Sequence, residues 1–188
     1  MAHDIKPWRV TASRDIFSSP WVKLRADDCI NGRGITVAPY YILEYADWVQ
    51  VVAITRNNDI VLVRQYRHGA AAVNLEIPGG VIDKGETDPV AAGRRELREE
   101  TGFDGEGELL GMHFANPGTQ NNRVFTVLVT GAQRVQDQAL DPSEDIAVEL
   151  MPLQDLYNNG IANAFCHIMH IASLGMAFEK LRARGLIA

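Results

Sequence analysis

The sequence predicts a mixed α/β fold in which helices sandwich a mixed sheet, preceded by a small antiparallel β unit. The sheet is indicated by two near-continuous apolar runs, Val49–Thr55 and Ile60–Val63, separated by four polar residues. Runs of this kind are typical of strands that are covered on both faces. A helical segment at residues 89–101 follows, and the last part of the chain is rich in helical patterns. Strands on either side of such a helix favour a layered arrangement.

Residues 7–46 carry the pattern of the antiparallel unit. Val22, Leu24 and Ala26 alternate with polar residues, and Asn31-Gly32 provides a turn signal before the next apolar stretch. We therefore expect an N-terminal β subdomain at residues 1–46 and a second domain at residues 47–188.

The helix at 89–101 has a clear start, because Asp88 is a good N-cap and Pro89 suits the first turn. Four further elements are expected after it, two strands followed by two helices: Glu108–His113, Arg123–Val129, Leu153–Tyr157 and residues 162–184.

Composition excludes several classes of protein. The chain of 188 residues has a net charge of −6 and no run of lysines or arginines, which argues against a nucleic-acid surface. Cys29 and Cys166 lack metal-ligand spacing, so neither a disulfide nor a catalytic thiol is expected. The N-terminus has no signal-peptide core and no segment suits a membrane span. We expect a cytoplasmic protein with no membrane partner.

Three carboxylates, Glu96, Glu99 and Glu100, stand at spacings of three and four residues in the predicted helix. That spacing gathers them on one face, where like charges repel. A charged surface helix would explain a bare pattern of this kind. A hard divalent cation would also explain it, because Mg²⁺ takes carboxylate oxygens and is normally shared with substrate phosphates.

The surrounding residues favour the cation, because the stretch from Gly80 to Phe103 resembles the Nudix box. Every specified position of that family pattern is filled: Gly80, Glu86, Arg95, Glu96, Leu97, Glu99, Glu100, Gly102 and Phe103. The one departure is that eight residues, and not seven, separate Glu86 from Arg95. We place the extra residue in the loop near Thr87. The resemblance implies the Nudix α/β/α sandwich and a hydrolase.

The resemblance also implies a metal site for Mg²⁺, with Mn²⁺ as the alternative ion. Glu96 and Glu100 are its expected core ligands, Glu99 shares in binding, and the backbone carbonyl of Gly79 is the expected further ligand. Gly79 and Gly80 suit close approach of the backbone to metal and phosphate, although the pair also suits a plain turn.

For two further charged residues of the box, Arg95 and Glu86, the sequence allows two roles each. Arg95 lies one turn before Glu99 and can support its carboxylate, or can form an ordinary surface pair. Two roles are considered for Glu86: it binds an outer metal ion, or it forms a hydrogen bond that anchors the loop.

Two segments outside the box narrow the substrate. The stretch from Val63 to Gly80 is similar to the segment that precedes the box in ADP-ribose and nucleotide-sugar pyrophosphatases, which implies that Arg67 reaches the diphosphate or the terminal sugar. A guanidinium suits bidentate phosphate contact; the alternative is a surface arginine. Pro117 resembles the downstream proline of the ADP-ribose branch.

The general base is expected in the acidic loop that begins at Asp141, which resembles the loop carrying the catalytic glutamate in these pyrophosphatases. Glu144 is favoured, with Asp145 and Asp141 behind it. A plain acidic turn, with Glu99 as the base, is the alternative.

Trp21, Trp48, Tyr40 and Tyr41 are candidates for stacking on a purine, with core or interface packing as the alternative. Trp48 is the one we include among the site residues. The resemblance implies a homodimer that packs through the N-terminal strands and recognises the base there. The pair His167 and His170 is interpreted as structural.

Together these features predict a Mg²⁺-dependent pyrophosphatase that splits ADP-ribose into AMP and ribose 5-phosphate by direct attack of water. One alternative keeps the reaction and changes the substrate to GDP-mannose or a broad set of nucleotide sugars. Another is a non-catalytic Nudix-fold module that senses a nucleotide.

Overall fold

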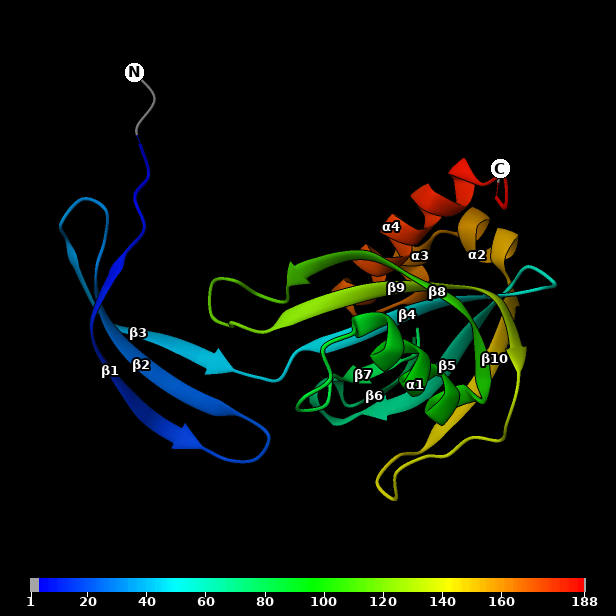
Figure 1. Ribbon diagram of the computed structural model, residues 1–188, viewed down its shortest axis with the longest axis horizontal. Helices are drawn as coiled ribbons and strands as arrows, with labels where there is room; N and C mark the ends of the chain where they lie inside the picture. The colour runs from blue at the N-terminus through cyan, green and yellow to red at the C-terminus, as the bar shows by residue number, and fades with distance from the viewer. Residues whose placement is uncertain (1–3, 188) are drawn as a thin grey trace. The chain divides into compact units, whose positions relative to one another are not determined.

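The computed structural model describes residues 4–187, which fall into two compact units (Figure 1). The first unit comprises the chain up to Ala46 together with Phe114–Arg123. The second comprises Asp47–His113 and the chain from Val124 onward. The segment 114–123 therefore belongs with the N-terminal strands, although it lies between two strands of the second unit in the sequence.

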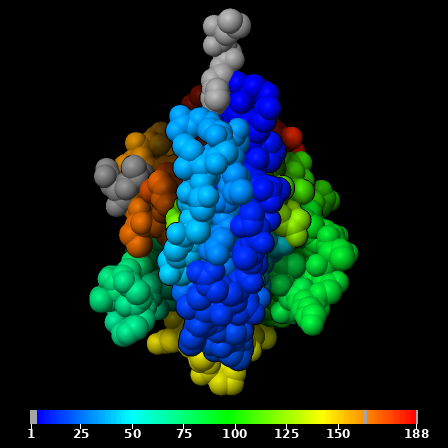
Figure 2. Space-filling model, turned by 90° about the vertical axis from the view of Figure 1, so that its left-hand side faces the viewer, coloured from blue at the N-terminus to red at the C-terminus, as the bar shows by residue number. Residues whose placement is uncertain are grey.

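The first unit is a three-stranded antiparallel sheet in the order β1-β2-β3: β1 (Arg9–Ser18), β2 (Lys23–Ile30) and β3 (Thr36–Glu44). Figure 2 shows these strands in blue and light blue. Every residue of β1 is exposed, whereas β2 buries Ala26, Asp27 and Cys29. The buried carboxylate of Asp27 accepts hydrogen bonds from Arg25 and Ser13, which together lower its pKa.

The segment 114–123 joins this sheet through β3. The backbone N–H of Leu43 donates to the carbonyl of Thr119 over 2.8 Å, and the hydroxyl of Tyr40 donates to the carbonyl of Gly118. The ring of Tyr40 also packs edge-on against Trp8, with 5.6 Å between ring centroids.

The second unit is built on a mixed sheet of seven strands, in the order β10-β5-β4-β9-β8 with β6 paired to β5 and β7 paired to β4. Its strands are β4 (Trp48–Thr55), β5 (Asp59–Arg67), β6 (Ala72–Glu76), β7 (Gly79–Val81), β8 (Phe103–Phe114), β9 (Arg123–Arg134) and β10 (Ile146–Pro152). The pair β4–β9 is parallel, and β4 pairs antiparallel with β5 and β7. The predicted mixed sheet between helices is confirmed.

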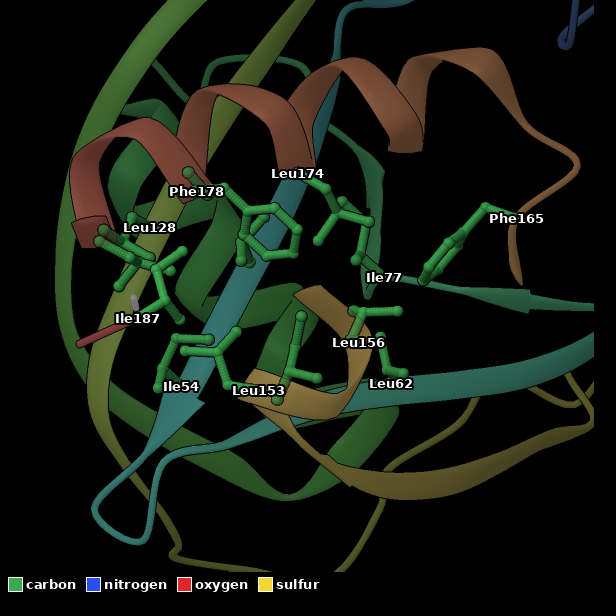
Figure 3. Packing of buried hydrophobic residues seen from close by; sticks show 14 of the residues in the cluster. Ile54, Leu62, Ile77, Leu128, Leu153, Leu156, Phe165, Leu174, Phe178 and Ile187 are labelled. Carbon is green, nitrogen blue, oxygen red and sulfur yellow. The ribbon is translucent and has the colours of Figure 1, made fainter. Parts of the chain in front are cut away.

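Alternate residues of the central strands enter two separate cores. Val49 and Val51 of β4 pack on one face with Ala92 and Leu97 of helix α1 (Pro89–Thr101). Ile54 and its neighbours pack on the other face, against the C-terminal helices. Figure 3 shows that core, in which Leu174, Phe178, Leu153 and Leu156 come from helices and lie over the sheet residues Ile54, Leu62 and Leu128. The helices are α2 (Leu153–Asn159), α3 (Ile161–Ala164) and α4 (Ile168–Ala183).

The single helix predicted at residues 162–184 is wrong. The chain forms the short α3, leaves the helical conformation at Phe165, and begins α4 at Ile168. Phe165 is buried in the core, and the Nδ1 of His167 accepts a hydrogen bond from the backbone N–H of Met169 and so caps α4. Apolar periodicity alone could not show this break, because Phe165 suits a helix face as well as a loop.

Other boundaries also differ from the sequence prediction. Strands β8 and β9 are longer at their ends, and β6 and β7 were not expected as separate strands. Among the described residues, no helix is both long enough and apolar enough to cross a membrane.

Candidate active site

Helix α1 sets the position of the acidic residues. Asp88 accepts a hydrogen bond from the N–H of Val90 over 2.9 Å, and Pro89 follows it in the first turn, as predicted. The helix ends at Gly102, whose φ of 77° is left-handed and whose Cβ, were one present, would lie 2.2 Å from the carbonyl oxygen of Gln136. Gly93 brings the helix close to the sheet, since a Cβ there would lie 3.1 Å from a methyl group of Val49.

Two glutamates of α1 meet the two glycines at the start of β7. The carboxylate of Glu96 lies so close to Gly80 that a Cβ on Gly80 would stand 2.6 Å from the carboxylate carbon. The Oε2 of Glu100 accepts a hydrogen bond from the N–H of Gly79 over 2.9 Å. A Cβ on Gly79 would lie 2.3 Å from the carbonyl oxygen of Val49. Backbone packing therefore requires glycine at position 79, whereas a Cβ at position 80 would displace the carboxylate of Glu96.

Arg95 binds the other carboxylates of the box. Its Nη1 donates to Glu96 and to Glu99, over 2.9 Å in each case. Its Nε and Nη2 donate to the two carboxylate oxygens of Glu86 over 3.1 and 3.0 Å. Glu86 also accepts from the backbone N–H of Asp83. In this structure Glu86 anchors the loop before α1, which is one of the two roles considered from the sequence.

Burial makes this cluster electrostatically unusual. Desolvation raises the pKa of Glu96 to about 7, against the opposing effect of the neighbouring Arg95. Glu100 is 4% exposed, and its pKa is raised to about 8, first by burial and then by the negative charges of Glu96 and Glu144. The negative charge of Glu144 also raises the pKa of Glu96. A cation placed between these groups would favour their ionised forms.

The donor set fits a hard divalent cation. The carboxylates of Glu96 and Glu100 lie beside Gly80 and Gly79, and Arg95 links Glu96 to Glu99. Carboxylate oxygens are ligands that Mg²⁺ prefers. Within residues 4–187, no three acidic, histidine or cysteine side chains form a ready-made metal cage. Mg²⁺ does not need one, since it keeps several waters and binds through one or two carboxylates plus substrate phosphates. Arg95 donates from one nitrogen to both Glu96 and Glu99 and so holds the two carboxylates together.

A cavity of about 710 Å³ opens beside the two glycines. This size is in the usual range for small-molecule sites. Gly79 and Gly80 form part of its wall together with Trp48, Gln50 and Arg67. Trp48 and Gln50 alternate with Val49 along β4, and all three line the cavity together with residues 166–170 at the start of α4. Trp48, Arg67 and Gly80, all predicted to bind substrate, are thus brought to one cavity.

Arg67 is fixed by a buried carboxylate that sequence reasoning missed. Its Nε and Nη2 donate to the two oxygens of Glu76 over 3.0 and 2.7 Å, and Glu76 is fully buried. Gln65 donates to the same carboxylate over 3.2 Å. A glutamate between apolar residues just before Pro78 was the available signal, because a charge is rarely buried unless it is paired.

The remaining predicted residues are exposed. Glu144 is exposed and its Oε2 accepts a hydrogen bond from the backbone N–H of Asp141 over 2.9 Å, which closes the acidic loop. Asp145 and Asp141 are exposed as well. Pro117 is exposed in the segment 114–123 of the first unit. The structure therefore groups the box residues and the cavity residues, and it leaves Pro117 in the other unit.

The start of α4 completes the cavity wall with residues that the sequence did not assign to the site. His167 and His170 stack with their ring centroids 4.6 Å apart and 11° between ring planes, and both line the cavity together with Cys166 and Met169. The break between α3 and α4 puts them there, and that break was not predicted.

Comparison with known proteins gives two family matches. Residues 46–167 match the NUDIX domain, and residues 8–43 match the nucleoside diphosphate sugar hydrolase N-terminal domain.

The chain is also similar to several whole proteins. It is 36% identical over 142 residues to the methanol dehydrogenase activator of Bacillus methanolicus, covering 75% of each chain. It is 28% identical over 149 residues to the ADP-ribose pyrophosphatase of Bacillus subtilis, covering 78% of this chain and 80% of the relative. It is 32% identical over 132 residues to the ADP-sugar pyrophosphatase of Mus musculus, covering 64% of this chain and 60% of the relative.

Among solved structures, the crystal structure of an ADP compounds hydrolase superposes with a TM-score of 0.85 at 20% identity, covering 98% of this chain and all of the other, which shows a shared fold. With the box residues gathered on α1, the glycine pair beside them and the NUDIX match over most of the chain, the protein belongs to the Nudix hydrolase family.

Proposed function

We propose that this protein hydrolyses the diphosphate bond of nucleoside diphosphate sugars in a Mg²⁺-dependent reaction, with ADP-ribose as the preferred substrate. One observation carries the proposal: the carboxylates of Glu96 and Glu100 contact Gly79 and Gly80 at the wall of a cavity of about 710 Å³. The match of residues 8–43 to a nucleoside diphosphate sugar hydrolase domain supports the substrate class. The pyrophosphatases of Bacillus subtilis and Mus musculus support the adenine nucleotide.

Glu96, Glu99, Glu100 and the carbonyl of Gly79 are the groups that would hold Mg²⁺, with Mn²⁺ as the alternative. When bound, the ion would neutralise charge that develops on the diphosphate oxygens. Arg95 positions Glu96 and Glu99 through its hydrogen bonds of 2.9 Å. The absence of side chains at Gly79 and Gly80 lets a phosphate group approach the backbone.

Arg67 binds the diphosphate in this proposal. Glu76 occupies its Nε and one terminal nitrogen, and no described residue accepts a hydrogen bond from Nη1. The buried carboxylate therefore fixes the guanidinium plane and leaves the terminal nitrogen Nη1 to donate to phosphate oxygens. Pro117 and Trp48 are the other proposed substrate contacts, and Trp48 stacks on the base.

Glu144 is the proposed general base, which takes a proton from the attacking water. Its charge acts on both Glu96 and Glu100, so its loop lies within electrostatic range of the box. Asp145, Asp141 and the box residue Glu99 are the alternatives. Water attacks directly and the products are AMP and ribose 5-phosphate.

The proposed assembly is a homodimer that packs through the first unit. Large apolar side chains are exposed there: Ile5, Trp8, Val10, Ile16, Phe17, Trp21, Ile35 and Tyr41. Apolar side chains gathered in this way favour a protein interface, and a second copy of the chain is the simplest partner. Sedimentation equilibrium of the wild type and of Trp21→Glu tests this; a monomeric wild type would refute it. The cytoplasmic location stays a prediction from the sequence.

The proposed activity is tested with a panel of nucleoside diphosphate sugars and a coupled phosphatase. The phosphatase releases phosphate from AMP and ribose 5-phosphate but not from intact ADP-ribose. We expect release with ADP-ribose that depends on Mg²⁺, and less with GDP-mannose. No release from any member of the panel, with or without Mg²⁺ or Mn²⁺, would refute a pyrophosphatase and favour a nucleotide-binding module.

A further inference from the structure

The cavity wall that α4 contributes contains a buried hydrogen-bonding group without a partner. His170 is 5% exposed and lines the cavity, and its Nδ1 has no hydrogen-bond partner among the described residues. A buried polar atom left unpaired costs about 1–3 kcal/mol. Such an atom in the wall of a binding cavity is explained when a ligand supplies the missing partner.

The ring of His170 is held in place by its neighbours. His167 stacks on it almost in parallel, with 4.6 Å between ring centroids, and His167 is itself fixed because its Nδ1 accepts from the N–H of Met169. Burial, together with the nearby His167 and Arg67, lowers the pKa of His170 to about 3, so its imidazole is neutral at physiological pH. A neutral imidazole offers one donor and one acceptor.

A second neutral group of the same wall comes from β4 and is hydrogen-bonded to Ser173, which lies one turn after His170 in α4. Gln50 is 5% exposed and lines the cavity, and its Oε1 accepts a hydrogen bond of 2.6 Å from the hydroxyl of Ser173. Ser173 also lies 2.9 Å from the hydroxyl of Thr126, and both hydroxyl groups are buried. This network fixes the oxygen of the Gln50 amide and leaves its nitrogen directed away from Ser173.

The charges of the lining residues indicate whether this wall suits the nucleotide half or the sugar half of the substrate. The only cationic side chain among its described lining residues is Arg67, which is paired with Glu76. Trp48 offers the large aromatic surface that a base requires, whereas the faces of His167 and His170 are turned to each other. Neutral groups that both donate and accept suit hydroxyl groups, and they supply no positive charge to a further phosphate.

We propose that His170 and Gln50, with His167 positioning the imidazole, bind the hydroxyl groups of the terminal sugar and so select nucleoside diphosphate sugars over other diphosphates. The inference rests on the proposed function and adds the residues that read the sugar. His170 is a specificity-determining residue in this account, and it takes no part in proton transfer.

The test compares two substrates that share the ADP half. ADP-ribose carries the sugar hydroxyls, and the methyl ester of ADP ends in a group without them. For His170→Phe, which keeps an aromatic ring for stacking, we expect kcat/KM for ADP-ribose to fall about 10- to 100-fold, the range for one or two lost hydrogen bonds. We expect kcat/KM for the methyl ester to stay within about twofold.

Two further variants make the result specific. His170→Asn places an amide near the position of Nδ1 and should recover part of the lost preference. His113→Phe makes the same exchange at an exposed position outside the cavity wall and should change neither substrate. Thermal melts of all three variants identify any loss of folding.

An equal fall for both substrates, or no fall for either, in folded His170→Phe would overturn the assignment. A wild type that hydrolyses neither compound would instead refute the proposed function. In that case the dissociation constants of ADP-ribose and the methyl ester decide the inference. A tighter complex with ADP-ribose that is lost in His170→Phe supports it, and equal affinities in the wild type refute it.

Discussion

The two faces of the sheet in the second unit carry different polar chemistry near the same pair of glycines. On the α1 face, Glu96, Glu99 and Glu100 come from one helix; Glu96 and Glu99 share the guanidinium of Arg95, and Glu100 accepts from the N–H of Gly79. On the α4 face, the polar groups that line the cavity come from β4 and α4, and they are neutral, as in Gln50 and His170.

The difference follows from what each face has to do. A reaction at a diphosphate needs concentrated charge, because charge develops on oxygen in the transition state. Recognition of a neutral sugar needs buried hydrogen-bonding groups, because a substrate without the matching hydroxyl leaves them unpaired and binds more weakly. The first face should therefore control turnover and the second face should control the choice of substrate. The following predictions test that division, beginning with the largest effect.

Glu100→Gln should lower turnover of ADP-ribose by about 10³-fold or more, the loss of several kcal/mol of transition-state stabilisation by a metal ligand. The amide still accepts from the N–H of Gly79, so the fold should remain. Turnover is measured in saturating Mg²⁺ beside Glu108→Gln, a surface carboxylate that pairs with Arg184. Near wild-type turnover in Glu100→Gln would show that the carboxylates on the α1 face are not the catalytic centre.

Glu144→Gln should lower kcat by about 10²- to 10⁴-fold, the usual contribution of a general base, and should leave substrate affinity unchanged. The comparison with Asp145→Asn and Asp141→Asn under the same conditions identifies the base within the loop. If none of the three loses more than about fivefold, under 1 kcal/mol of barrier, the loop is a plain turn and Glu99 becomes the leading candidate.

Arg67→Ala should lower kcat/KM by about 10- to 100-fold, since one charge-assisted contact to the diphosphate is lost. The structure adds a complication, because the variant leaves the buried Glu76 unpaired and should also unfold more easily. The double variant Arg67→Ala with Glu76→Gln separates the effects. Recovery of both stability and kcat/KM in the double variant would show that Arg67 serves only to neutralise Glu76.

Glu86→Gln should have the smallest effect, a fall in turnover of less than about tenfold, or 1.4 kcal/mol. Glu86 binds Arg95 and the N–H of Asp83, so its loss loosens the loop before α1 without removing a metal ligand. The Mg²⁺ concentration for half-maximal rate should not change. A large rise in that concentration would assign Glu86 to an outer metal site.

The α1 face could be predicted from the sequence because its residues are close in the chain. Glu96, Glu99 and Glu100 lie within one helix, and the cap at Asp88 fixes where that helix begins. The mixed sheet was also predictable, since the runs at Val49–Thr55 and Ile60–Val63 are buried on both faces.

The α4 face could not be predicted in the same way. Gln50 and His170 become neighbours of one cavity only after the sheet has formed and the chain has left the helical conformation at Phe165. The two histidines at 167 and 170 have a spacing that suits any helix face, so their position on the cavity wall needs the tertiary structure. The pairing of Arg67 with Glu76 likewise depends on the register between β5 and β6.

The central claim is that the α1 carboxylates hold a divalent cation beside Gly79 and Gly80. Calorimetric titration of Mg²⁺ into the wild type and into Glu100→Gln, each with a non-hydrolysable analogue of ADP-ribose, tests it most directly. We expect Mg²⁺ to bind the wild type and to bind Glu100→Gln at least about tenfold more weakly, a loss of 1.4 kcal/mol. Equal Mg²⁺ affinities in the two proteins would contradict the account.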